Sequence, residues 1–280
     1  MDGEVWSVMA RSSGSAPRSG NRRSSPHSVG LAGKVDALRR LALFGTGSDE
    51  ELAKLATAAS MRRLRRGQRL VRSALGGHLV AMAKGLIAVS LARDEANDDR
   101  RGELIVDILV AGGVSVDWCW GGQEFASHGA VVGLDDAVVM LVPRGPLESY
   151  LAVEVGAALR LLATVAAARA RAVAMAVQNA HLGIGDRLYC RLVELAHLRG
   201  RPVVGGLLVE HGLAQSQLAA FANASRENVN RQLGEWRADG WIALKRGAVL
   251  VRHADALSRS VSPLARRVGF GAGDGRLPLA

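Results

Sequence analysis

The sequence predicts an α+β chain in which a β-rich N-terminal domain is followed by one long helix and a C-terminal helix-turn-helix. Between residues 61 and 147, short apolar runs are separated by glycine pairs and polar loops, a spacing typical of a β sandwich, jelly roll or barrel. Residues 148–177 then form an Ala/Leu/Val-rich run, and residues 215–238 indicate two helices separated at Asn223. A length of 280 residues permits two such domains.

The boundaries follow from composition. Ser, Gly, Arg and Pro dominate the first 33 residues, which therefore cannot bury enough apolar surface to offset the entropy of ordering. Ser48, followed by three acidic residues, is typical of a helix N-terminus. We expect a disordered tail over 1–33, a β domain opened by two short helices over 34–148, a helix over 149–177, a C-terminal domain over 178–262 and a tail over 263–280.

The composition favours a cytoplasmic protein with an anionic partner. The formal net charge is +10, which favours nucleic acid, an acidic protein surface or anionic lipid. The two cysteines, Cys119 and Cys190, cannot form a disulfide framework or a four-thiolate metal site within one chain. Residues 1–30 lack the continuous apolar segment of a secretory signal.

The apolar run at residues 148–177 predicts a helix that packs against a partner. Charged residues interrupt it too often for a transmembrane span, so we expect no membrane association. The helix is either buried within its own domain or a dimerisation seam. Its apolar side chains keep a spacing of three to four residues: Leu151, Val155, Leu159, Leu162 and Val165.

The second helix of the C-terminal pair has the composition of a DNA-recognition helix. Ser225 is placed to cap it, and Val229, Leu233 and Trp236 recur on one face as a buried stripe. Arginine binds guanine edges or phosphates, and glutamate accepts from cytosine. The outward and flanking positions carry Arg226, Glu227, Asn230, Arg231 and Gly234.

A basic hairpin follows this helix. Asp239 and Gly240 end the helix, and two apolar runs then flank Lys245 and Arg246, which suits a wing that contacts phosphates. Helix pairs with a Gly or Asn break also occur in enzymes, but the added basic wing favours DNA binding. The sequence contains no HExxH, GxxxxGK, GxGxxG or Ser-His-Asp arrangement that would indicate an enzyme.

The segment FANASRENVNRQL at 221–233, followed by DGWI at 239–242, resembles the DNA-binding domain of the Crp–Fnr family. The core Ser-Arg-Glu-x-Val-x-Arg matches Ser225, Arg226, Glu227, Val229 and Arg231. The resemblance extends over residues 35–260 and implies a jelly roll like a cyclic-nucleotide-binding domain, a long dimerisation helix and a winged helix-turn-helix. It also implies that Arg226, Glu227 and Arg231 read base edges in a half-site that contains G·C pairs.

The resemblance is weaker in the β domain, the part that resembles a cyclic-nucleotide-binding domain. Members that bind cyclic AMP have Gly-Glu followed by Arg-Ser, whereas this chain has Val116-Asp117, and Phe125 or Ser127 where the arginine is required. A cyclic phosphate without its cation loses a charge-assisted pair, so we expect that cyclic AMP is not the ligand. Two tryptophans fill the space or frame a more apolar ligand, and the candidate pocket comprises Asp117, Trp118, Trp120 and Ser127.

We predict no cofactor and no metal site. His78, Cys119 and His128 are conceivable haem or metal ligands, but they are isolated residues without ligand spacing. A dense basic run indicates a half-buried strand with a solvated face, although a contact with bent DNA or RNA polymerase is the alternative. The run comprises Arg62, Arg63, Arg65, Arg66, Arg69 and Arg72.

These features predict a transcription regulator that binds a pseudo-palindromic operator as a homodimer. Its expected partners are double-stranded DNA and a second copy of the chain, with RNA polymerase as a further candidate. The alternative is a ligand-independent DNA-binding dimer whose β domain is a scaffold or a protein-interaction surface.

Overall fold

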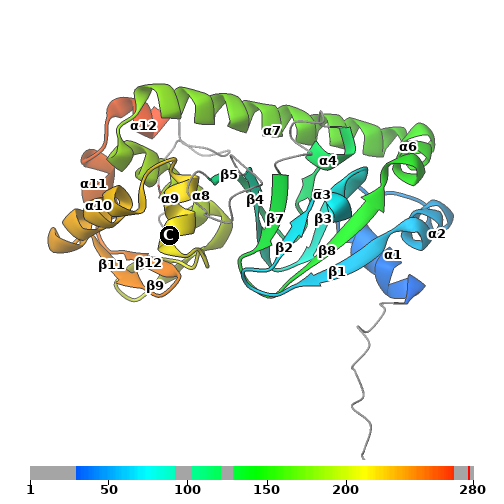
Figure 1. Ribbon diagram of the computed structural model, residues 1–280, viewed down its shortest axis with the longest axis horizontal. Coiled ribbons are helices and arrows are strands. Elements are labelled where there is room, and N and C mark those ends of the chain that lie inside the picture. Colours follow the sequence, from blue (N-terminus) through cyan, green and yellow to red (C-terminus); the bar gives the residue numbers. More distant parts are fainter. Residues whose placement is uncertain (1–29, 92–102, 121–128, 268–276, 278–280) are drawn as a thin grey trace, which may run out of the picture.

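The computed structural model describes residues 30–91, 103–120, 129–267 and 277, and it has two domains spanned by one long helix (Figure 1). The expected tail over 1–33 lies mostly outside these residues, but a helix, α1 (Leu31–Arg39), already begins within it. α2 (Asp49–Ala58) follows, and the Ser48 hydroxyl caps it by accepting from the Glu51 backbone N–H at 3.3 Å. Two short helices therefore open the β domain, as expected from the acidic first turn of α2.

In the described residues the β domain is a sandwich of two four-stranded antiparallel sheets, ordered β1-β8-β3-β6 and β2-β7-β4-β5. The strands are β1 (Ser60–Leu64), β2 (Arg69–Val71), β3 (His78–Lys84), β4 (Leu86–Leu91), β5 (Leu104–Val110), β6 (Val114–Ser115), β7 (Gly129–Gly133) and β8 (Ala137–Pro143), with the short helices α3 (Arg72–Leu75) and α4 (Asp117–Trp120) between them.

β4, a central strand of the sheet β2-β7-β4-β5, is buried on both faces. On β4, Ile87 and Val89 point into the sandwich, whereas Leu86 and Ala88 pack into the cluster formed with the C-terminal domain. A strand buried on both faces is apolar at successive positions, which accounts for the unbroken run Leu-Ile-Ala-Val at residues 86–89.

The long apolar run forms two helices instead of one. α6 (Arg144–Val153) ends at Glu154, where the backbone leaves the helical region, and α7 (Val155–His181) then runs along both domains (Figure 1). The Glu154 carboxylate accepts from the Ser48 backbone N–H at 3.2 Å, so the break places an acidic side chain at the N-terminus of α2. By length and composition alone, α7 also meets the requirement for a membrane-spanning helix.

The C-terminal domain places a helix-turn-helix and a hairpin against α8 (Ile184–Arg199). Its sheet, ordered β11-β12-β10-β9, is antiparallel. The remaining elements are β9 (Gly200–Val203), β10 (Gly206–Val209), α9 (Gln215–Phe221), α10 (Arg226–Ala238), β11 (Ile242–Lys245), β12 (Ala248–Val251), α11 (Ala254–Arg259) and α12 (Pro263–Arg267). α12 lies within the range expected to be a tail, and it is ordered because Ala265 is buried against α8.

His211, in the loop between β10 and α9, is a buried titratable group. It is 5% exposed, and its Nδ1 accepts from the Leu213 backbone N–H at 3.1 Å. Burial, together with the charge of Arg66, lowers the pKa of His211 from 6.5 to about 4. The neutral imidazole is therefore the form that the fold accommodates.

This shift predicts that acid destabilises the protein through His211. Between pH 6.5 and about 4 the unfolded chain binds a proton that the folded chain does not, so stability falls as pH decreases through this range. His211→Gln keeps an acceptor but does not titrate. Denaturant unfolding at several pH values should show the wild type losing about 2–3 kcal/mol more than this variant. Parallel pH profiles for the two proteins would contradict the assignment.

Candidate nucleic-acid interface

The turn between α9 and α10 is built on a left-handed residue. Asn223 has φ 49°, a backbone conformation that Asn tolerates better than most side chains. The guanidinium of Arg187, on α8, donates to the carbonyls of Ala222 and Asn223, each at 3.0 Å. These bonds satisfy two turn carbonyls and attach the turn to α8. The role of Arg187 was not predicted, because it depends on carbonyls about 35 residues further along the chain.

α10 begins where the sequence predicts and buries the predicted stripe. The Ser225 hydroxyl accepts from the Asn228 backbone N–H at 3.2 Å, which caps the helix. Val229, Leu233 and Trp236 are buried in the core of the domain. The helix is therefore anchored along one side, and its other side faces solvent.

The exposed side of α10 carries three of the predicted DNA-contact residues. Arg226, Glu227 and Arg231 are all exposed. Gly234 lies on the same side, and a Cβ added there would meet no atom within 4 Å. The surface is therefore charged and locally flat, as a helix that enters the major groove requires.

Asn230 is less accessible than its predicted role requires. The side chain is only partly exposed, and its Oδ1 is buried with no hydrogen-bond partner among the described residues. Asn230 therefore lies at the border between the exposed side and the core, one position away from the most outward residues.

The predicted wing is present. β11 and β12 pair so that Lys245 is opposite Ala248, and Arg246 and Gly247 form the turn between them. Gly247 has φ 70°, a left-handed backbone conformation that glycine adopts without a steric penalty. Lys245 and Arg246 are both exposed at this tip, so two cations project beside the helix-turn-helix.

The basic run of the β domain extends from β1 through the turn that follows it to β2 and the start of α3. Arg62 and Arg63 are exposed on β1, an edge strand, whereas Arg69 forms a 2.7 Å ion pair with Glu103. Arg66 donates to the Gly212 carbonyl at 2.6 Å, close to the turn of the wing. The side chain of Arg72 is not among those described. The run therefore has a solvated side, and one arginine attaches the β domain to the C-terminal domain.

The candidate effector residues that the structure describes lie in different surroundings. Trp118 is 2% exposed and belongs to the apolar interior of the sandwich, whereas Trp120 is 38% exposed and donates to Glu148 on α6 at 3.1 Å. Asp117 accepts from the Ser115 hydroxyl at 2.6 Å, and Ser127 lies outside the described residues. The two tryptophans thus point to different environments, because they are two positions apart on the short helix α4.

The candidate metal ligands are dispersed. Cys119 is buried in the cluster beneath α1 and α2, and burial raises the pKa of its thiol to about 11. His78 lies at the start of β3, with Nδ1 2.9 Å from the Gly76 carbonyl. His128 is not among the described residues. Where the structure describes the chain, no group of three His, Cys, Asp or Glu side chains is placed to hold a metal ion.

Sequence comparisons assign the C-terminal domain. Residues 186–260 match the family model described as a Crp-like helix-turn-helix domain. The chain is 36% identical over 76 residues to the CRP-like cAMP-activated global transcriptional regulator of Mycobacterium tuberculosis (strain ATCC 25618 / H37Rv), which covers 27% of this chain and 34% of that protein. It is 35% identical over 66 residues to the anaerobic regulatory protein of Bacillus subtilis (strain 168), covering 24% and 28%. The chain thus spans about a third of the curated relatives that it matches.

Structural comparisons cover both domains. A CooA mutant from Carboxydothermus hydrogenoformans superposes with a TM-score of 0.61 at 16% identity, over 74% of this chain and 89% of that one. FixK2 from Bradyrhizobium japonicum superposes with a TM-score of 0.58 at 18% identity, over 73% and 98%. The comparisons confirm the α+β fold and the resemblance to Crp–Fnr regulators predicted from residues 221–242.

Proposed function

Because the chain carries a Crp-like helix-turn-helix domain within the fold of CRP/FNR transcription regulators, we propose that it regulates transcription as a homodimer on a pseudo-palindromic operator. One observation carries the proposal: α10 buries an apolar stripe and exposes Arg226, Glu227 and Arg231 on the opposite side. Such a regulator is not an enzyme, and its site of action is the cytoplasm.

Each exposed residue has a distinct role in this proposal. Arg226 and Arg231 donate to guanine edges, and Glu227 discriminates at a neighbouring pair by accepting from cytosine. Lys245 and Arg246, on the wing, bind phosphates and set the register of the domain on the duplex. Asn230 contributes less than these residues because its amide oxygen is buried.

The dimer forms through α7. This helix packs on its own chain through Ala157, Leu161 and Gln178, yet several large apolar side chains lie exposed on the opposite side. A one-sided stripe with many alanines suits a second helix that approaches closely. A helix that spans a membrane would be apolar around its whole circumference. α7 does not meet this requirement, because it carries Arg160, Arg169 and Arg171. The exposed stripe comprises Val155, Leu159, Leu162, Val165, Val173 and Val177.

The β domain is not a cyclic-AMP sensor in this proposal. Val116-Asp117 stands in place of the Gly-Glu pair, and apolar side chains including Trp118 fill the described interior of the sandwich. In the alternative, the β domain senses no ligand at all and acts as a scaffold or as a surface for a protein such as RNA polymerase. The exposed arginines of β1 suit such a surface, since an arginine-rich edge attracts acidic partners.

Replacing Arg231 by alanine should relax sequence preference. We expect a loss of about 1–3 kcal/mol on the preferred operator and little change on random DNA, because the arginine reads a base. Lys245→Ala is the matched control, since a phosphate contact should weaken binding to all sequences equally and lower the salt dependence. Fluorescence anisotropy on both duplexes measures the two effects. Equal losses of Arg231→Ala on operator and random DNA would show that this residue does not read bases.

Charges placed in the exposed stripe of α7 should separate the dimer. Leu159→Glu with Leu162→Glu buries two unpaired charges from each protomer in the dimer but leaves them exposed in the monomer. Sedimentation velocity should therefore detect a monomer, and circular dichroism should show an unchanged helix content. Ala167→Glu, at an exposed position beside the stripe, should leave the dimer intact. A double variant with the wild-type sedimentation coefficient would exclude α7 as the dimer seam.

Cyclic AMP should leave the thermal stability unchanged. A ligand that binds only the folded state at 100 times its Kd stabilises it by about 2.7 kcal/mol, which a thermal-shift assay detects readily. The same assay with other cyclic nucleotides and metabolites separates a sensor from a ligand-independent dimer. A saturable shift with cyclic AMP would overturn the proposed divergence of the β domain, whereas a shift with another metabolite would exclude the scaffold alternative.

A further inference from the structure

The C-terminal domain is docked on the β domain through an apolar seam. Leu86, Ala88, Ile105, Ile108 and Val132, on the outer face of the sheet β2-β7-β4-β5, belong to the same buried cluster as the helix-turn-helix. α9 lies against β5, and Figure 1 shows both elements below α7 in this view. The orientation of the recognition helix is therefore coupled to the contacts at this seam.

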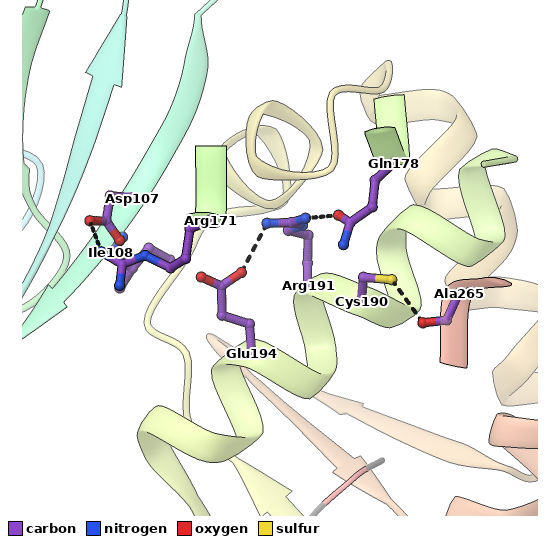
Figure 2. A network of polar contacts seen from close by, with 8 residues as sticks. All are labelled: Asp107, Ile108, Arg171, Gln178, Cys190, Arg191, Glu194 and Ala265. Carbon is purple, nitrogen blue, oxygen red and sulfur yellow. Dashed lines mark hydrogen bonds and ion pairs between the residues drawn. The ribbon is translucent and has the colours of Figure 1, made fainter. Parts of the chain in front are cut away.

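A polar cluster lies at the point where β5, α7 and α8 meet (Figure 2). Arg171, on α7, forms a 3.0 Å ion pair with Asp107 on β5. Arg191, on α8, forms a 2.9 Å ion pair with Glu194 and bonds to the Gln178 side chain on α7. Two carboxylates and two guanidinium groups from both domains are thus gathered around the long helix.

The two carboxyl groups share the charge of Arg171. Burial raises the pKa of both Asp107 and Glu194, and Arg171 opposes this rise at each of them. The negative charge of Asp107 further raises the pKa of Glu194. Asp117 adds a further negative charge near Asp107. Figure 2 shows Arg171 on the side of Glu194 that faces Asp107 and Arg191 on its other side, so without Arg171 the carboxylates of the two domains would face each other with no cation between them among the residues drawn.

The cluster continues to the helix-turn-helix. The guanidinium of Arg191 lies 5.0 Å from the centre of the Phe221 ring, on the last turn of α9. One turn earlier on α8, Arg187 bonds to the carbonyls of the turn that leads into α10. α8 therefore contacts the helix-turn-helix at two points, at Phe221 on α9 and at the turn between α9 and α10. A displacement of α8 relative to α7 would reorient α10.

We propose that Arg171 is a positioning residue that sets the orientation of the recognition helix, by pairing a carboxylate of the β domain with the long helix beside the α8 cluster. The inference rests on the proposed DNA-binding dimer. In such a dimer the two recognition helices must match two half-sites at a fixed separation, so the orientation set at this junction determines the spacing that the protein accepts.

The test measures affinity for operators whose half-sites are moved apart or together in single-base-pair steps, and for a duplex with one half-site. The wild type should show one sharp optimum of spacing. Arg171→Met should weaken binding about tenfold at that optimum and flatten the profile, while single-half-site affinity stays unchanged because the exposed side of α10 is intact. Arg40→Met removes an exposed arginine from the end of α1 and should behave as the wild type.

Two further variants keep the proposal testable if Arg171→Met folds poorly. Asp107→Asn breaks the same pair while removing a buried charge, so it should flatten the profile more mildly. In the double variant the effects should not add, because both changes remove one interaction. Folded Arg171→Met and Asp107→Asn proteins with the wild-type spacing profile would overturn the inference. A wild type without any spacing optimum would instead contradict the proposed dimer.

Discussion

The burial of Val229, Leu233 and Trp236 is the constraint on which the interface depends. Burying a side chain such as Val or Leu contributes about 1.5–3 kcal/mol, so rotation of α10 about its axis would expose this stripe at a large cost. The opposite side must then carry the polar residues, and it presents Arg226, Glu227 and Arg231. The hairpin that follows extends the same exposed surface with two cations.

α7 combines two opposite kinds of contact on its two sides. The side that faces its own chain includes Arg171 and Gln178, which bind charged and polar groups of β5 and α8. The other side is apolar and exposed. In a monomer this long apolar stripe would be exposed to water, which is unfavourable in free energy. Pairing with a second copy would remove it from water. A single helix would then determine both the dimer and the orientation of each DNA-binding domain.

The features that the sequence predicts well are local. The start of α10 at Ser225, its buried stripe and the wing follow from residues a few positions apart, and the structure contains them all. The break at Glu154 was not predicted, because its role at the N-terminus of α2 depends on residues about a hundred positions away. The same holds for the pairing of Asp107 with Arg171. Trp118 and Trp120 were grouped in one pocket, yet a short helix directs them to different environments.

The most direct measurement of the central claim is the selection of bound fragments from a random DNA pool by the purified 280-residue chain. The account predicts enrichment of a pseudo-palindrome whose two half-sites contain G·C pairs and lie about one helical turn apart, centre to centre. An enriched single half-site would contradict the two-fold arrangement through α7. No enrichment over the starting pool would contradict the assignment of α10 as a helix that reads bases.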